Sequence, residues 1–157
     1  MVRLLPMTEL DFRAYREHLI REYAADKVRS GNWSEEGALE RSARETDQLL
    51  SDGLKTPEHY LFSIHDDASN RNVGILWFAI VNWGGKRLAF IYDIEVDAND
   101  RGKGYGSQAL IALEEKVKTL GLNIIGLHVF GHNQVARKLY EKLGYEITNI
   151  NMAKQLS

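Results

Sequence analysis

The residues best suited to chemistry lie in one short segment, RGKGYGS at positions 101–107. Glycines at alternate positions let the backbone bend and approach a ligand closely. The segment stands between a predicted strand and a predicted amphipathic helix, where free backbone N–H groups and the helix dipole favour an anion. The pattern predicts a phosphate-binding loop, although a plain strand-to-helix turn is equally compatible with a glycine-rich loop taken alone. The candidate binding residues are Arg101, Gly102, Lys103, Gly104, Tyr105, Gly106 and Ser107.

The spacing of this loop excludes two nucleotide-binding motifs. It lacks the lysine-serine ending of a Walker A loop, and its G-x-G-x-G pattern differs from the G-x-G-x-x-G of a dinucleotide fold. It also follows a predicted antiparallel strand late in the chain, whereas a Rossmann loop follows the first parallel strand. Nucleotide cofactors of these two kinds are therefore not expected.

Two carboxylates precede the loop on the predicted strand 86–96. Asp93 and Glu95 alternate with Tyr92, Ile94 and Val96, so we expect the acids on one face and the apolar set on the other, under the helix 104–120. Two acids close together tend to raise one pKa toward the range of a general base. Glu95 is the preferred candidate base, and a solvated or substrate-binding carboxylate is the alternative.

Histidine and cysteine supply little further chemistry. His128, on the next predicted strand, competes with Glu95 as a base, but an isolated histidine on a strand is more often structural. The remaining histidines show no metal-ligand spacing, so no metal site is predicted. The chain has no cysteine, which excludes disulfides, thiolate metal sites and a cysteine nucleophile.

The first half of the chain predicts a short strand at 2–5 and two helices. Thr8 with Asp11 resembles a capping box that opens the first helix, and Ser34 is expected to cap the second. Trp33, between them, predicts an aromatic packing contact or, alternatively, a wall of a binding site. The predicted apolar stripes are Phe12, Tyr15, Leu19 and Tyr23 on the first helix and Leu39, Ala43, Thr46 and Leu50 on the second.

The second half predicts an antiparallel meander followed by alternating helices and strands. The three strands of the meander begin at His59, at Val73 and at Lys86, and the Gly84–Gly85 pair joins the last two. A helix with a stripe of Ala109, Leu110, Leu113, Val117 and Leu120 follows, then a strand at 124–130. Asn133 opens a short helix, and residues 145–152 predict a final strand.

Length and charge predict one domain over residues 1–157. The net charge of −2 and the pI near 6.2 provide no field that would attract nucleic acid, so any anionic ligand must be held by local groups. No apolar segment approaches the ~20 residues of a membrane span, and the N-terminus lacks the apolar region of a signal peptide. We therefore expect a cytoplasmic protein without a membrane partner.

Three segments of the chain resemble the GNAT superfamily of N-acetyltransferases. Residues 101–106 resemble the R/Q-x-x-G-x-G/A signature that binds the pyrophosphate of acetyl-CoA. Residues 91–96 resemble the central strand of the family, and residues 133–145 resemble its second conserved block. The resemblance covers essentially the whole chain and extends to bacterial members of the YycN type. It implies an α/β (α+β) fold with a mixed, mostly antiparallel sheet, helices on both faces and the order β-α-α-β-β-β-α-β-α-β(-β).

The resemblance also implies roles for individual residues. Pantetheine would pair with the backbone near Ile94 and Val96, and the Val96 N–H would polarise the thioester carbonyl. Tyr140 would protonate the departing thiolate, since a phenol pKa near 10 is within reach of a thiol. Without the motif, Tyr140 would be interpreted only as one more member of the apolar stripe of its helix. Asn133 would bind the pantetheine arm as well as capping its helix.

The implied function is acetyl transfer from acetyl-CoA to a primary amine of a small molecule or peptide. Alternatives are an acyltransferase that uses another acyl-CoA or acts on protein N-termini, and a non-catalytic acyl-CoA-binding or scaffold domain. Tyr140 together with a cleft carboxylate argues against the non-catalytic alternative. The general base is left open between Glu95, His128 and water. Members of the family are often monomers or dimers, and the resemblance leaves open whether this chain is a monomer or a homodimer.

Overall fold

The computed structural model describes residues 1–157 and arranges them around a five-stranded sheet. The chain forms two compact units, Met1–Leu127 and His128–Ser157. The first contains the whole sheet and three α-helices: α1 (Glu9–Arg29), α2 (Ala38–Leu49) and α3 (Tyr105–Thr119). The second contains α4 (Gln134–Lys142). No helix combines the length and apolar character that a membrane crossing requires.

The strands follow one another across the sheet in chain order. They are β1 (Val2–Pro6), β2 (His59–Asp66), β3 (Arg71–Trp83), β4 (Lys86–Val96) and β5 (Ile125–Leu127). The first three pairings are antiparallel, and β4 pairs with β5 in parallel. Short 3-10 helices lie at Gly53–Lys55 (η1) and Ala98–Asp100 (η2). The predicted mixed, mostly antiparallel α/β fold is confirmed.

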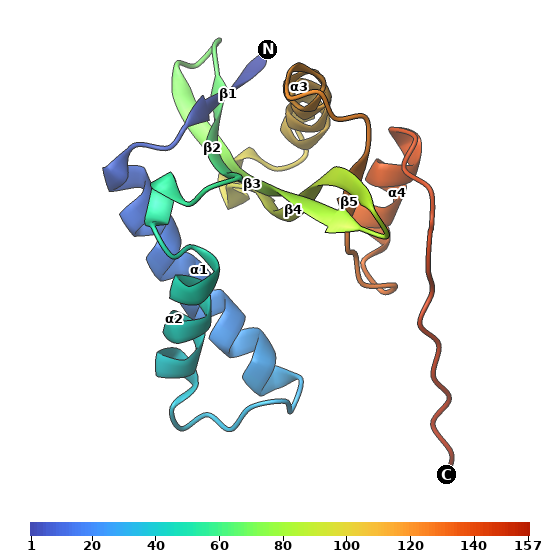
Figure 1. The fold of residues 1–157 in the computed structure, drawn as a ribbon. Coiled ribbons are helices and arrows are strands. Elements are labelled where there is room, and N and C mark those ends of the chain that lie inside the picture. The colour runs from blue at the N-terminus through green and yellow to red at the C-terminus, as the bar shows by residue number, and fades with distance from the viewer. The chain divides into compact units, whose positions relative to one another are not determined.

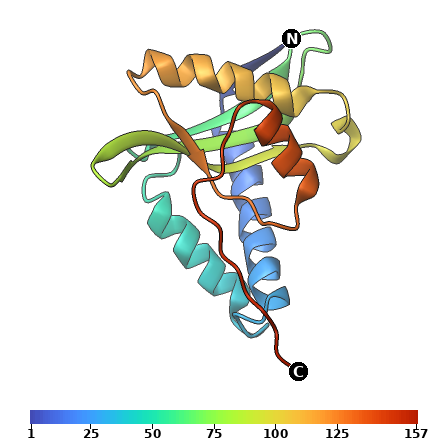
Figure 2. The ribbon, with the colours of Figure 1, turned by 90° about the vertical axis from the view of Figure 1, so that its right-hand side faces the viewer.

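Helices cover both faces of the sheet within the first unit (Figures 1 and 2). On one face, Tyr15 of α1 packs in a buried cluster with Trp77 of β3. On the other face, Lys116 of α3 lies 6.0 Å from the ring of Phe62. Consecutive strand residues point to opposite faces, so Trp77 belongs to the α1 face and Phe78, stacked near Phe62, to the α3 face. Four of the five residues of the predicted α3 stripe are buried, and the fifth, Leu120, is half-buried at the end of the helix.

Helix α1 begins as predicted, but α2 does not. The Thr8 hydroxyl accepts a hydrogen bond from Asp11 N–H at 3.1 Å. Helix α2 starts at Ala38 rather than after Ser34, because Gly37 has the left-handed φ of 75° that ends the preceding turn. The predicted stripe of the second helix is confirmed at Thr46 and Leu50, which are buried, and is wrong at Leu39, which is 54% exposed. The residues that face inward are Ala38, Ser42 and Thr46.

Trp33 packs between the first two helices. It is buried, its ring meets Tyr23 of α1 edge-on at 5.4 Å, and the Arg41 guanidinium of α2 lies over it at 4.4 Å. Of the two interpretations of Trp33, the packing contact is the one that this geometry supports.

The expected alternation along β4 is wrong at Tyr92, because a β-bulge interrupts it. Trp77 pairs with Asp93 and Phe78 pairs with Ile91, so Tyr92 is the extra residue. Its ring stacks on Trp77 at 4.8 Å, which places Tyr92 on the α1 face with Asp93 rather than on the α3 face with Ile94.

The end of the chain also differs from the prediction. The strand expected at 124–130 is shortened to β5, and residues 145–157 contain no helix or strand. The apolar residues of this segment change phase, from Tyr145 and Ile147 to Ile150 and Met152. A strand buries one face with a period of two, so this segment presents no single apolar face that would require a partner.

Candidate active site

The glycine loop has the backbone geometry of an anion site. Gly102 and Gly104 have φ angles of 78° and 83°, which favour glycine, and α3 begins at the next residue, Tyr105. Gln108 N–H donates to Gly104 O at 3.1 Å and starts the helical hydrogen bonding. The N–H groups of the preceding first turn have no partner within the helix. They therefore point outward at the positive end of the helix dipole.

Two tethers fix the loop to the sheet, one on each side. Before the loop, the carboxylate of Asp100 accepts two hydrogen bonds from the Arg71 guanidinium at the start of β3. After the loop, the Tyr105 hydroxyl donates to Asp66 at the end of β2, at 2.9 Å. Hydrogen bonds from Ser69 and Tyr105 lower the pKa of Asp66 to about 2, and the bond from Arg71 lowers the pKa of Asp100. Both carboxylates are thus charged anchors.

The two basic side chains of the loop are exposed, and each is oriented by a contact with a neighbouring residue. Arg101 is 61% exposed and donates through Nε to Val96 O at 3.0 Å. Lys103 is 54% exposed and lies 3.6 Å from Asp100. Arg101 thus lies at the end of β4 and Lys103 beside Asp100, where both can place positive charge next to a bound pyrophosphate.

Strand β4 continues past the end of its parallel neighbour. The pairing of β4 with β5 ends at Ile91 and Leu127, while β4 runs on to Val96. Asp97 N–H donates to Val73 O of β3 at 2.8 Å. N–H directions alternate along a strand, so the N–H groups of Val96 and Ile94 point away from β3, toward the side where β5 has ended. These are the two backbone positions predicted to pair with pantetheine.

The backbones of β3 and β4 lie unusually close together at this end of β4. Gly74 lies opposite Val96, and a Cβ at Gly74 would come within 2.3 Å of Glu95 O. Any side chain at Gly74 would push the two strands apart. The strand geometry at Val96 therefore depends on this glycine.

The carboxylates of β4 both reach α1, as the predicted face requires. Tyr15 donates its hydroxyl to Asp93 at 2.7 Å, and His18 Nε2 lies 3.1 Å from Glu95 Oε2. Burial raises the pKa of Asp93; the Tyr15 hydrogen bond opposes this shift, and the charge of Glu95 adds to it. Burial, followed by the charge of Asp93, raises the pKa of Tyr15 well above its usual value. Asp93 is thus a held carboxylate, while Glu95 is 37% exposed.

A cavity of about 300 Å³ opens beside Glu95 and His18. Three carboxylates line it, and no lysine or arginine does; burial, and after it the charge of Asp100, raises the pKa of Asp97. A cavity with this lining suits a positively charged or hydrogen-bond-donating group. Its lining residues are Asp11, Ala14, Tyr15, His18, Ser63, Asn72, Gly74, Ile75, Glu95 and Asp97.

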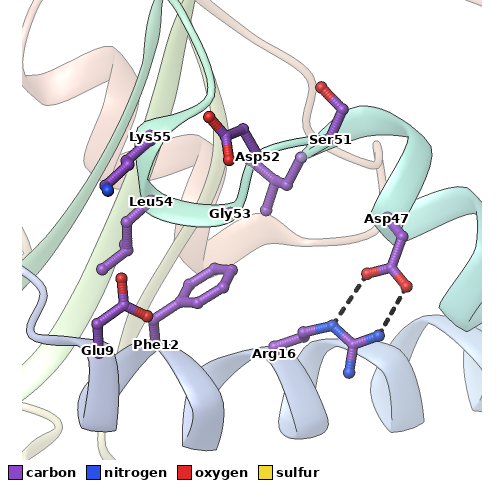
Figure 3. A pocket seen from close by; sticks show the side chains of 10 residues that line it. Glu9, Phe12, Arg16, Asp47, Ser51, Asp52, Gly53, Leu54 and Lys55 are labelled. Atoms are coloured by element: carbon purple, nitrogen blue, oxygen red, sulfur yellow. Dashed lines mark hydrogen bonds and ion pairs between the residues drawn. The ribbon is translucent and has the colours of Figure 1, made fainter.

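A second cavity, of about 430 Å³, lies between α1, the end of α2 and η1 (Figure 3). Arg16 and Asp47 face each other across it and form two hydrogen bonds of 3.0 and 2.8 Å. The Phe12 ring and Gly53 form part of its wall. None of the predicted site residues lines this larger cavity, and Arg16 and Asp47 are paired with each other. We therefore interpret it as a gap between packed helices rather than as a binding site.

The remaining predicted site residues belong to the second unit. Asn133 caps α4, since its side chain accepts a hydrogen bond from Ala136 N–H at 3.2 Å. Tyr140 lies on α4 with its ring edge-on to Tyr145 at 5.5 Å. His128 meets Phe130 edge-on at 5.0 Å. The helix cap is therefore observed, and Tyr140 and His128 both have aromatic contacts within their own unit.

Sequence reasoning missed the partners that hold the site residues. His18 and Tyr15 stand three positions apart on α1, so they share a helix face, and Tyr15 was already in the predicted stripe. That spacing was an available signal for His18. The anchors Asp66 and Arg71 gave no comparable signal, because each meets its partner across 29 or more residues of chain.

Comparison with known proteins gives a consistent answer. The model of the acetyltransferase (GNAT) family matches residues 14–145. Over 155 residues the chain is 40% identical to the uncharacterized N-acetyltransferase YycN of Bacillus subtilis (strain 168), covering 99% of both chains. It is 37% identical over 150 residues to YdgE of the same organism, covering 96% of this chain and 95% of YdgE. The crystal structure of YycN superposes with a TM-score of 0.87 over 100% of this chain and 99% of that one.

Proposed function

Because the chain belongs to the GNAT family of acetyltransferases, we propose that it transfers an acetyl group from acetyl-CoA to a primary amine. The observation that carries the proposal is the course of β4, which continues past the end of β5 and leads directly into the glycine loop. This arrangement offers backbone N–H groups to an extended cofactor arm and an anion site to its pyrophosphate.

The cofactor is proposed to bind mainly through backbone. The first-turn N–H groups of α3, near Tyr105, Gly106 and Ser107, would receive the pyrophosphate, with Arg101 and Lys103 adding charge. The N–H groups of Ile94 and Val96 would pair with the pantetheine arm and polarise the thioester carbonyl. Asn133 would contribute its amide to the same arm.

The acetyl transfer is proposed to proceed by direct attack. Glu95 accepts a proton from the ammonium, and the amine nitrogen then attacks the thioester carbonyl carbon. The C–S bond breaks as the new C–N bond forms, and the thiolate takes a proton from Tyr140. The amide nitrogen loses its extra proton to solvent, and a solvent proton restores the Tyr140 hydroxyl. Glu95 is favoured as the base because it lines the cavity beside β4, whereas Asp93 is already held by Tyr15.

The experiment that tests the proposal is a thermal-shift titration with acetyl-CoA, CoA, ATP and NAD in parallel. A ligand at 100 times its Kd adds about 2.7 kcal/mol, which should raise the Tm by several degrees. Stabilisation by acetyl-CoA and CoA alone supports the cofactor assignment, and thiol release with a panel of primary amines then tests transfer. No response to either CoA species would overturn the proposal.

The role of Tyr140 has its own test. Tyr140→Phe should lower kcat by roughly 10²–10⁴-fold while acetyl-CoA affinity stays unchanged. The matched control is Tyr145→Phe, which removes a hydroxyl from the other ring of the same edge-on pair. Equal effects of the two substitutions on kcat would assign Tyr140 to packing.

A further inference from the structure

A row of aromatic rings runs along the α1 face of the β3–β4 hairpin. Trp83 lies 5.3 Å from Phe90, Phe90 lies 5.2 Å from Tyr92, and Tyr92 stacks at 4.8 Å on the buried Trp77. We call Trp83, Phe90 and Tyr92 the aromatic row. Trp83 is 49% exposed and Tyr92 is 38% exposed, so the row presents ring surface to ligands rather than filling the core.

Backbone features of this chain create the row. The bulge in β4 turns Tyr92 to the α1 face, next to Asp93, where regular alternation would have sent it to the opposite face. On β5, Gly126 lies opposite Phe90, and a Cβ there would come within 3.3 Å of the Trp83 ring. The absent side chain leaves room for that ring beside β5.

The row ends at the carboxylates of the candidate site. Asp93 follows Tyr92 directly, and Glu95 lies two residues further on the same face, about 7 Å along the strand. A protonated amine is attracted both by a carboxylate and by the face of an aromatic ring. An apolar or aromatic group joined to that amine would then lie against the rings, where stacking stabilises it beyond the burial of area.

Building on the proposed function, we infer that the acceptor is an arylalkylamine, with its amine at Glu95 and its ring on the aromatic row. Simple alkylamines would gain the contact with the carboxylate but not the stacking. Diamines would place a second ammonium group, rather than an aryl group, against the rings and would also lack the stacking. The aromatic row is therefore a specificity-determining surface, distinct from the groups that move protons.

The test compares 2-phenylethylamine, n-butylamine and 1,4-diaminobutane as acceptors, with thiol release from acetyl-CoA as the assay. We expect kcat/KM for 2-phenylethylamine to exceed the other two by roughly 2- to 13-fold, as one aromatic contact predicts. Tyr92→Ala should remove most of this preference through KM, and Tyr92→Phe should retain it. Trp83→Ala, at an exposed position, gives the same test if Tyr92→Ala does not fold. Ile111→Ala, exposed on α3, is the control and should change nothing.

The outcomes separate this inference from the proposed function. Failure of acetyl-CoA to bind overturns the proposed function itself. Acetyl transfer to n-butylamine or 1,4-diaminobutane at an equal or higher kcat/KM overturns the arylalkylamine inference and leaves the acetyltransferase intact. If none of the amines is acetylated, calorimetry of 2-phenylethylamine with the CoA complex decides. Binding that Tyr92→Ala weakens supports the inference. Binding that Tyr92→Ala leaves unchanged, or the absence of binding, overturns it.

Discussion

The glycine loop and the carboxylate face of β4 adjoin each other in the chain but are built in opposite ways. The loop is a run of consecutive residues whose ligands are backbone N–H groups, held by Asp100 before it and Tyr105 after it. The carboxylate face is assembled from side chains of α1 and β4 that are 77 and 78 residues apart. The first is a backbone site, and the second is a side-chain site.

This difference separates what each region controls. Substitutions in the loop act through backbone conformation and should change cofactor affinity. Substitutions on the carboxylate face act through proton transfer and acceptor contacts and should change turnover.

The largest effect on cofactor affinity is expected at the loop, from Gly104→Asp. A side chain at φ 83° strains the backbone, and its carboxylate would stand where we place the pyrophosphate. Acetyl-CoA affinity should fall by on the order of 100-fold or more, measured by calorimetry. The control is Gly121→Asp, which adds the same charge at a similar φ of 78° just beyond the other end of α3. Equal losses from both would show that folding, rather than the anion site, had been damaged.

On the other side, Glu95→Gln keeps the shape of the side chain and removes its basicity. We expect kcat to fall by roughly 10²–10⁴-fold with the acceptor that the amine panel identifies. Acetyl-CoA affinity should change by no more than a few-fold, because the only link to the loop is the exposed contact of Glu95 with Arg101 at 3.9 Å. A large loss of acetyl-CoA affinity would contradict the separation of the two regions.

Local signals account for what the sequence predicted of the loop. Gly102 and Gly104 stand at alternate positions before an amphipathic stripe, so the turn, the helix start and the anion site follow from neighbouring residues. Most of the sheet was predictable for the same reason, since the meander strands alternate and are joined by short turns. The tethers of the loop were not predictable, because no local pattern joins Asp66 to Tyr105.

The carboxylate face was only half predictable. Alternation placed Asp93 and Glu95 together, but the bulge that turns Tyr92 to their face depends on how β3 and β4 pair. No residue type in the sequence predicts such a bulge. His18 and Tyr15 reach β4 only because α1 packs across the sheet, a contact between elements rather than within one.

A smaller effect, on stability, is expected from Tyr15→Phe. The substitution removes the hydroxyl that donates to Asp93 at 2.7 Å and leaves a half-buried carboxylate without that donor. The free energy of unfolding should fall by about 1.5–3 kcal/mol in denaturant titrations. Tyr23→Phe is the control on the same helix, since its hydrogen bond to Glu45 is 3.4 Å long. Equal losses would mean that the carboxylate contact of Tyr15 contributes no more than a weak peripheral one.

The smallest effect concerns the anchor of α3 and appears only in acid. The folded-state pKa of Asp66, about 2, lies below the ordinary value of 3.8, so its charge stabilises the fold above pH 4 and this contribution is lost as the pH falls toward 2. Asp66→Asn keeps one acceptor oxygen for Ser69 and Tyr105, which both donate to the same carboxylate oxygen, but has no charge to lose. The Tm advantage of the wild type over Asp66→Asn should therefore be constant from pH 6 to 5 and shrink between pH 4 and 2. A Tm advantage that stays constant to pH 2 would show that the charge of Asp66 contributes nothing. The contact between Tyr105 and β2 would then be a hydrogen bond that does not depend on the charge of Asp66.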